Sequence, residues 1–288
     1  FCGAKSKKIR LRLETIDKGT IEELIVPHLS KGKRGFKSKI PSCQVVMAIF
    51  YRLKTGCQWR ELPLKQFTDT VEMSWESVYY YFNKWGKDGS WRSAWIALLR
   101  SKRALLDLSS MQLDGSHTAA KRGGQAVGYQ GRKASKTSNA LFLSDNTGLM
   151  LALSEPQAGQ HHDLYQIKTL FTELCSLLKE AGIDSRGIFL NADPGFDSKE
   201  LRSACIEKEI EANIKPNPRN KEKDEDENWY FDEELYKRRT VIEHANAWMD
   251  GFKGLVMRYK VLTRNWMAMH WMAFLVFFLQ RINKQTKV

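Results

Sequence analysis

The chain has 288 residues, of which 42% are hydrophobic, 27% are charged and 11% are aromatic. These proportions are typical of a folded protein and exclude an intrinsically disordered one. The length is sufficient for a large buried core, arranged as one large domain or as two unequal ones.

Positive charge is concentrated in the first part of the chain. Lys and Arg number 46 against 33 Asp and Glu, which gives a net charge of +13. Residues 1–110 hold 21 basic and 10 acidic side chains, whereas residues 111–288 hold 25 and 23. This asymmetry favours a nucleic-acid-binding module joined to a nearly neutral second part. A basic surface without a partner is the alternative.

The five cysteines form no CxxC pair and have no zinc-ligand spacing with histidine. A low and odd number of cysteines is typical of a protein in a reducing cytosol. No signal peptide is visible in the sequence. These features together predict a cytoplasmic protein.

The first hundred residues predict short helices. Apolar residues have helical spacing over 21–29 and over 45–53, the second stretch starting at Pro41-Ser42 and stopping at Gly56. A further helix is predicted over 71–85. Short helices with a basic loop resemble a helix-turn-helix module, although any small helical bundle has this periodicity. We therefore predict a helical, basic DNA-binding domain over residues 1–105, in which the DNA contacts are Lys33, Arg34, Lys37 and Arg60.

A helix is predicted over 91–106, and after Ser109 the pattern changes to strands that alternate with helices. The predicted strands are 110–114, 140–144, 148–154, 186–193 and 211–215, with a hairpin turn at Asp145–Gly148. The predicted helices are 164–181, 198–208, 234–252 and 265–280. The last is uncharged but shorter than the ~20 residues of a membrane span, so it predicts a buried helix and no membrane partner. We predict an α/β catalytic domain over residues 106–288, with helices beside a mixed sheet.

Three acidic residues stand out in this second part. Asp114 and Asp193 are at the carboxyl ends of two predicted strands, the edge of an open α/β sheet where ligands bind, and Glu243 lies inside a predicted helix. Carboxylate oxygens suit Mg²⁺ or Mn²⁺, and two such ions can catalyse an in-line displacement at a phosphodiester. For each acid alone, a helix cap, a turn residue or a surface residue is the simpler interpretation.

The segments around these acids resemble insertion-sequence transposases of the DDE class, of the four/five supergroup with a ribonuclease H-like core. Five segments carry the resemblance in the family's order: LDGSH at 113–117, GRKASKT at 131–137, AGQHHD at 158–163, ADPGFDS at 192–198, and the pattern Tyr236-x2-Arg239-x3-Glu243. The upstream TGCQWRELP at 55–63 is similar to the family's N-terminal helical domain. The likeness covers about residues 20–280.

The resemblance implies a ribonuclease H-like mixed sheet flanked by helices and preceded by a small all-α, helix-turn-helix-like domain. It implies that Asp114, Asp193 and Glu243 are the catalytic residues and the ligands of two Mg²⁺ or Mn²⁺ ions. Further DNA contacts are expected at Arg132, Lys133, Lys136, Tyr236, Arg239 and Lys253. For Arg239 the alternative is an ion pair within its helix, and for the basic stretch a solvated loop.

The expected function is a bacterial DNA transposase, associated with the nucleoid and acting as a homodimer. It would bind the terminal inverted repeats of its element in double-stranded DNA, cleave there, and join 3′-hydroxyls to target DNA. One departure is Asp250, which stands where the family signature has Lys. Two other interpretations stay open: a plain ribonuclease H-like nuclease, and an inactive DNA-binding protein derived from a transposase.

Overall fold

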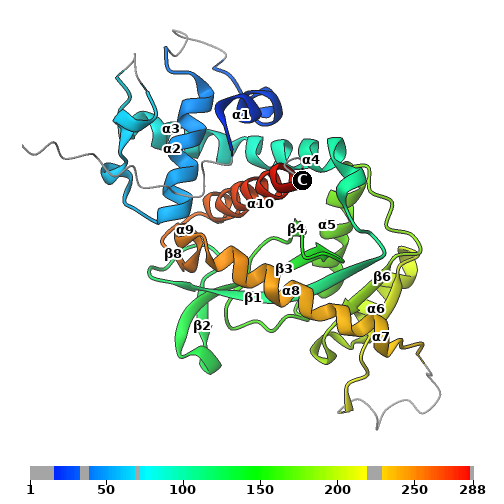
Figure 1. Ribbon diagram of the computed structural model, residues 1–288. Helices are drawn as coiled ribbons and strands as arrows, with labels where there is room; N and C mark the ends of the chain where they lie inside the picture. The colour runs from blue at the N-terminus through cyan, green and yellow to red at the C-terminus, as the bar shows by residue number, and fades with distance from the viewer. Residues whose placement is uncertain (1–15, 33–38, 69–71, 219–228, 286–288) are drawn as a thin grey trace, which may run out of the picture.

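A computed structural model describes residues 16–32, 39–68, 72–218 and 229–285. An N-terminal group of helices stands beside a mixed sheet that has helices on both faces (Figure 1). The predicted DNA contacts Lys33, Arg34 and Lys37 lie outside the described residues.

The N-terminal helices begin and end at local signals in the sequence. They are α1 (Lys18–Leu24), α2 (Ser42–Thr55), α3 (Trp75–Lys87) and α4 (Ser90–Ser101). The side chain of Asp17 caps α1, that of Ser74 caps α3, and Gly56 ends α2 in the left-handed conformation. The helices expected from apolar spacing are thus confirmed. The helix predicted over 71–85 begins at Trp75 and continues through Gly86 to Lys87.

The sheet has the strand order of a ribonuclease H-like core. Its central strand β1 (Ser110–Ala120) pairs antiparallel with β3 (Ser135–Asp145) on one side and parallel with β6 (Phe189–Ala192) on the other. Strand β7 (Glu211–Ile214) extends the sheet parallel to β6, and β4 (Met150–Leu153) pairs antiparallel with β3. This arrangement confirms the predicted mixed sheet and the hairpin turn between β3 and β4.

Three short strands were not predicted. They are β2 (Gly128–Gln130) and β5 (Gln157–Ala158), which pair with β3, and β8 (Met257–Arg258), which pairs with Ala119 and Ala120 of β1. Strands of two or three residues are too short to show an alternating pattern, so only their partner strands define them.

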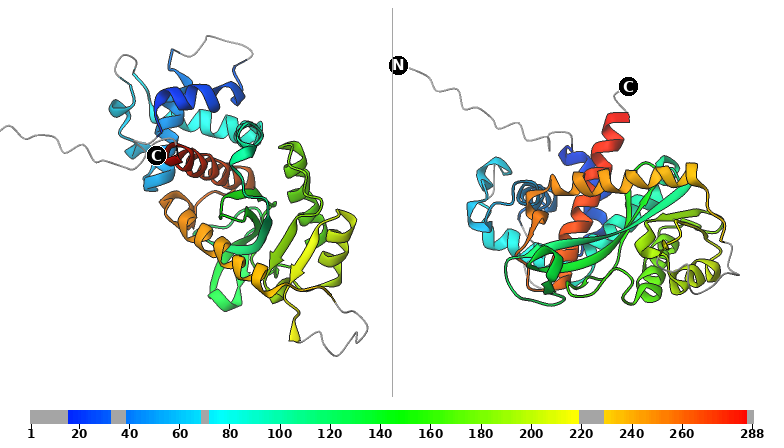
Figure 2. Two further views of the ribbon diagram at one scale, coloured as in Figure 1. Left: turned by 45° about the vertical axis from the view of Figure 1, so that its right-hand side comes forward. Right: turned by 90° about the horizontal axis from the view of Figure 1, so that it is seen from below.

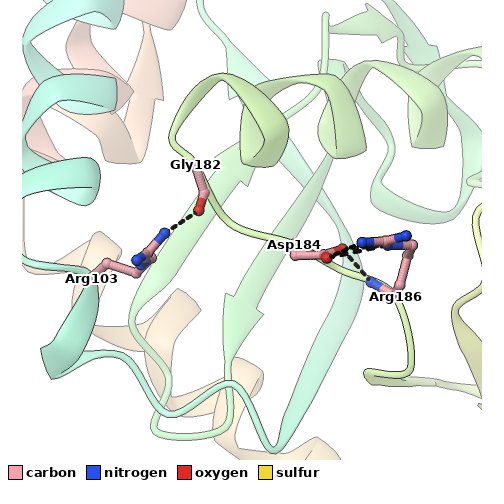
Figure 3. Close-up of polar contacts among 4 residues, drawn as sticks. All are labelled: Arg103, Gly182, Asp184 and Arg186. Carbon is pink, nitrogen blue, oxygen red and sulfur yellow. Dashed lines mark hydrogen bonds and ion pairs between the residues drawn. The ribbon is translucent and has the colours of Figure 1, made fainter.

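Helices cover the two faces of the sheet differently. The helices α5 (Ile167–Glu180) and α6 (Lys199–Glu207) lie on one face, and α7 (Glu233–Tyr236) and α8 (Thr240–Asp250) lie on the other (Figure 2). The turn after α5 is held by polar contacts: Arg103 Nη1 donates to the Gly182 carbonyl at 2.6 Å, and Arg186 pairs with Asp184 at 2.7 Å (Figure 3).

The C-terminal helix α10 (Thr263–Gln285) joins the helical group to the sheet. It follows the short helix α9 (Lys253–Val256) and strand β8, and it packs against α2, α3 and α4 (Figure 1). Trp95 of α4 contacts Phe274 of α10 at 5.5 Å between ring centroids, and its Nε1 donates to the Leu151 carbonyl of β4 at 2.9 Å. The predicted buried helix is therefore confirmed.

Among the described helices, none combines the length and apolar character that crossing a membrane requires. The boundary at 105/106 stays a prediction, since α10 of the second part packs within the first and one hydrophobic cluster runs through both.

Replacing Gly56 with Ala should destabilise the protein more than replacing Gly89 with Ala. Both glycines have positive φ, 70° and 76°, so both substitutions should cost about 1 kcal/mol in backbone strain. Only at Gly56 would the new Cβ also meet backbone, 3.0 Å from the Lys253 carbonyl oxygen, whereas nothing lies within 4 Å at Gly89. Urea unfolding should show a loss at Gly56 that is roughly 1 kcal/mol larger; equal losses would contradict the close packing of α2 on α9.

Candidate active site

Asp114 and Asp193 stand side by side at the point where two parallel strands stop pairing. The last paired residues of β1 and β6 are Leu113 and Ala192, and each acid is the next residue along its strand. The prediction that the first strand ends at Asp114 is wrong, because β1 continues to Ala120 along β3. It is the end of β6 that leaves one side of β1 open at Asp114.

A buried row of amide side chains crosses the parallel strands two residues before the acids. Gln112, Asn191 and Asn213 are register partners on β1, β6 and β7 and are fully buried. Asn191 Nδ2 donates to Gln112 Oε1 at 3.0 Å, and Asn213 Nδ2 donates to Asn191 Oδ1 at 2.7 Å. Strand residues two apart share a face, so this row lies on the same face as Asp114 and Asp193.

The same amides hold the segment that carries Arg239 and Glu243. Asn191 Nδ2 donates to the Leu235 carbonyl at 3.2 Å, and Asn213 both donates to the Asp232 carbonyl at 3.0 Å and accepts from the Asp232 amide at 2.8 Å. These bonds fix the start of α7 on the sheet. The chain continues from there into α8, which packs across β1 and β3.

Asp114 faces α8 and contacts Asn246, a residue that the sequence analysis did not single out. Asn246 Nδ2 donates to Asp114 Oδ2 at 2.9 Å. Burial and the charges of Asp193 and Asp163 raise the pKa of Asp114 from 3.8 to about 6, against the lowering effects of the Gly115 backbone and Arg239. Asn246 is three residues after Glu243 and so lies on the same helix face, and this spacing could have indicated from the sequence that Asn246 faces the site.

Asp163 approaches β1 from the opposite face, where Gly115 provides the space. A Cβ on Gly115 would lie 2.4 Å from Asp163 Oδ1, so only glycine allows this approach. Asn139 Nδ2 donates to the same oxygen at 2.7 Å. Asp163 belongs to the AGQHHD segment, where its residue type alone indicated no role. Its carboxylate adds negative charge near Asp114.

Glu243 does not join the two aspartates directly. Its side chain is 53% exposed, and its Oε1 pairs with Arg239 Nη2 at 2.6 Å, four residues earlier on the helix. Burial lowers the pKa of Arg239, but the charges of Glu243, Tyr236 and Asp193 and the bond to Glu243 outweigh this effect and raise it. Within the described part of the chain, no three acidic, histidine or cysteine side chains are close enough to enclose a metal ion.

The donor chemistry nevertheless fits a hard divalent cation. Asp114 and Asp193 offer only oxygen ligands, which Mg²⁺ and Mn²⁺ prefer. The raised pKa of Asp114 reports negative charge crowded in a partly buried place, and a bound cation would offset that repulsion. Asp114 and Asp193 are the residues that would hold it, with Glu243 as the further predicted ligand.

The predicted DNA contacts fall into two groups. Arg132, Lys133 and Lys136 are exposed around the β2–β3 turn, and Lys133 Nζ lies 3.4 Å from the His117 carbonyl on β1. Tyr236 is near Arg239, whose Cζ lies 5.9 Å from its ring centroid. By contrast, Arg60 and Lys253 lie with the helical group: Arg60 is over the Trp75 ring at 5.2 Å, and Lys253 packs its backbone against Gly56.

Comparison with known families agrees with the fold. Residues 20–95 match the model of a putative transposase of the IS4/5 family, and residues 100–278 match the model of the transposase DDE domain. The second match covers more than half of the chain. The chain therefore belongs to the transposase DDE domain family.

Solved structures give only remote matches. The pre-cleavage Mos1 transpososome is 12% identical with a TM-score of 0.29, over 88% of this chain and 82% of that chain. The Mos1 strand transfer complex is 10% identical with a TM-score of 0.26, over 88% and 81%. Likeness at this level supports no conclusion. No curated protein matches the chain.

Replacing Asp114 with Asn should stabilise the metal-free protein at about pH 8. The pKa of Asp114 is higher in the folded chain than the ordinary value of 3.8, so the folded chain binds this proton more tightly than the unfolded chain. The carboxylate therefore costs no stability below about pH 4, and its cost grows until it is complete above about pH 6. Urea unfolding should show a gain for Asp114→Asn on the order of 2 kcal/mol at about pH 8.

The two proteins should converge in stability as the pH falls to about 4. Asp184→Asn is the matched control, because Arg186 lowers the pKa of this exposed carboxyl to about 2 and its removal should bring no gain. MgCl₂ or MnCl₂ should stabilise the wild-type chain and not Asp114→Asn. A wild-type chain whose stability has the same pH dependence as that of the variant would contradict the crowding of charge at Asp114.

Proposed function

We propose that this chain is a DNA-cleaving and DNA-joining enzyme that mobilises its own element. It binds the terminal inverted repeats, cleaves at the element ends and joins the resulting 3′-hydroxyls to target DNA. The observation that supports this most is the pair of adjacent carboxylates, Asp114 and Asp193, at the open edge of a ribonuclease H-like sheet in a chain of the transposase DDE domain family.

The catalytic residues in this proposal are Asp114, Asp193 and Glu243. Bound divalent ions, two per site, would supply activation of the attacking oxygen and stabilisation of the leaving oxygen in an in-line displacement. Asn246 orients the Asp114 carboxylate through its amide. Asp114 is held by the pairing of β1 with β3, and Asp193 follows β6 and accepts from the Gly195 amide at 2.7 Å. Glu243 on α8 is then the carboxylate that must change its contacts.

Arg239 is suited to control that change. Its ion pair with Glu243 is partly exposed, and such pairs contribute little to stability. A DNA phosphate that binds Arg239 would compete with Glu243 for the guanidinium and free the carboxylate to turn toward Asp193. The two interpretations of Arg239, helical ion pair and phosphate ligand, then describe the states without and with DNA.

DNA is proposed to contact both parts of the protein. The exposed cations Arg132, Lys133 and Lys136 adjoin the strand that carries Asp114 and would meet backbone phosphates there. The helical group would recognise the element ends through Arg60, and Lys33, Arg34 and Lys37 are further proposed contacts. Pairing of two ends implies a homodimer, which the family resemblance alone supports.

The two alternatives make different products. A plain nuclease of the same fold would cleave DNA and join nothing, so a strand-transfer assay separates it from the proposal. An inactive DNA-binding protein would do neither. The intact pair Asp114 and Asp193 and the crowded charge around it argue against loss of activity, because an inactive site would not need to keep that repulsion.

Substituting each of Asp114, Asp193 and Glu243 with Ala should abolish cleavage and joining while element-end binding is retained. The physical reason is that carboxylates position metal ions and do not recognise DNA sequence. Cleavage is measured on labelled element-end DNA with Mg²⁺, and binding is measured by fluorescence anisotropy. Mg²⁺-dependent cleavage by Glu243→Ala would exclude Glu243 as the third catalytic acid.

Substituting Lys33, Arg34 and Lys37 together with Ala should weaken binding to element ends. These substitutions in the full chain are preferred to deleting residues 1–108, because without those residues α10 would lose its packing against α2, α3 and α4. If each side chain neutralises one phosphate, the slope of log K against log salt should become shallower by about 3. The matched control variant replaces three exposed cations of α5 and the turn after it, namely Lys168, Lys179 and Arg186. The salt dependence of its binding should have the same slope as that of the wild-type chain.

A further inference from the structure

A pocket separates the helical group from the end of the sheet, away from the acidic residues. Its wall on one side is the end of α2, the turn Trp59–Glu61 and the start of α3; on the other side are Arg122 after β1 and Tyr259–Leu262 after β8. These segments lie near one another beside α9 in Figure 1. The volume of about 860 Å³ is within the range of ligand pockets.

The pocket is lined by cations and by no acidic residue among those described. Arg52, Arg60, Arg122 and Lys260 all line it. Arg52 is only 8% exposed, and its Nε and Nη1 have no hydrogen-bond partner within the described part of the chain. A buried charge without a partner is costly, and an anion in the pocket would remove that cost.

The position of Lys260 adds to this excess of positive charge. Burial and the neighbouring charges of Arg52 and Arg258 lower the pKa of Lys260 to about 7. Its Nζ donates to the Gly254 carbonyl at 3.2 Å, which is a neutral acceptor. Cations that repel one another around one space indicate a site for an anion.

Aromatic rings form the rest of the wall. The Arg52 guanidinium lies over the Trp59 ring at 4.5 Å, and Trp59 contacts the Tyr79 ring at 5.2 Å. Trp75 also lines the pocket, under Arg60, and Tyr259 is 56% exposed at its rim. Rings of this kind stack with nucleobases regardless of base identity. Tyr79 and Tyr259 keep exposed ring surface on which a base can stack, and an inorganic anion would make no use of that surface.

We propose that this pocket holds one unpaired nucleotide of DNA, with its phosphate at Arg52 and Arg122 and its base among Trp59, Tyr79 and Tyr259. The inference rests on the proposed function for its choice of DNA over a free nucleotide. Strand β1 links the pocket to the active site, since Ala120, six residues after Asp114, pairs with Arg258 next to Tyr259. Six residues of a strand span ~20 Å, which corresponds to roughly six nucleotide steps.

The test uses the full chain and two short duplexes of the same flanking sequence. One carries a single unpaired 2-aminopurine nucleotide in one strand, and the other is fully paired. Anisotropy should show about tenfold tighter binding of the duplex with the unpaired nucleotide, the size expected for one stacked base. The 2-aminopurine fluorescence should fall on binding, because stacking on an aromatic ring quenches it.

Arg122→Gln and Tyr259→Ala should remove this preference. Both side chains are exposed at the rim, so these variants test the pocket even if Arg52→Gln does not fold. Arg186→Gln, which removes an exposed cation outside the pocket, is the control and should keep the preference. Equal affinity of the wild-type chain for the two duplexes, or an unchanged preference in Arg122→Gln and Tyr259→Ala, would overturn the proposal.

Competitors separate the sources of the ligand. Deoxyadenosine monophosphate should displace the duplex with the unpaired nucleotide at concentrations where inorganic phosphate does not; equal competition by phosphate would overturn the role of the base. Tight binding of the free nucleotide without a preference between duplexes would overturn the DNA source.

Asp114→Ala should keep the preference for the duplex with the unpaired nucleotide while losing cleavage. A chain that cleaves and joins element ends but prefers neither duplex refutes the pocket and leaves the proposed function standing.

Discussion

The buried amide row of Gln112, Asn191 and Asn213 is the constraint on which the candidate site depends. A buried amide is costly unless its donors and acceptors are satisfied, and these three satisfy one another only when β1, β6 and β7 are in the observed register. A shift by one residue would turn the amides to the other face and separate Asp114 from Asp193. The remaining donors of the Asn191 and Asn213 amides bind the backbone carbonyls of Leu235 and Asp232. The same row therefore positions the segment that carries Arg239 and Glu243.

Repulsion between carboxylates is the second organising force. Burial and the neighbouring aspartates hold Asp114 at a raised pKa, and the protein answers this charge locally with Asn246 and Arg239. Those two side chains come from one short stretch of chain, 239–246, which also carries Glu243. A bound metal ion would relax this repulsion, whereas a DNA phosphate would compete with Glu243 for the guanidinium of Arg239.

The helical group and the sheet are coupled through α10. This helix comes last in the chain but packs among the first helices, while Trp95 of α4 bonds to the backbone of β4. DNA held by the helical group would therefore be held at a fixed distance from Asp114 and Asp193. The positively charged pocket lies at this junction, with walls from both parts of the chain. One continuous hydrophobic core joins the helical group to the sheet. Such a connection would suit the proposed enzyme, which must bind an element end and cleave the DNA nearby.

Residue pattern by itself determined the longer helices and strands and the order of the acids, because helical spacing, the stop at Gly56 and the end of the strand before Asp193 are all local. The resemblance of short motifs then indicated the family. Tertiary structure alone decided that Asn246 contacts Asp114, that Asp163 reaches β1 beneath Gly115, and that Nε and Nη1 of Arg52 are buried without a hydrogen-bond partner among the described residues. These contacts join residues far apart in the chain or depend on side-chain orientation. No local spacing encodes them, because they arise only when strands and helices pack in one register.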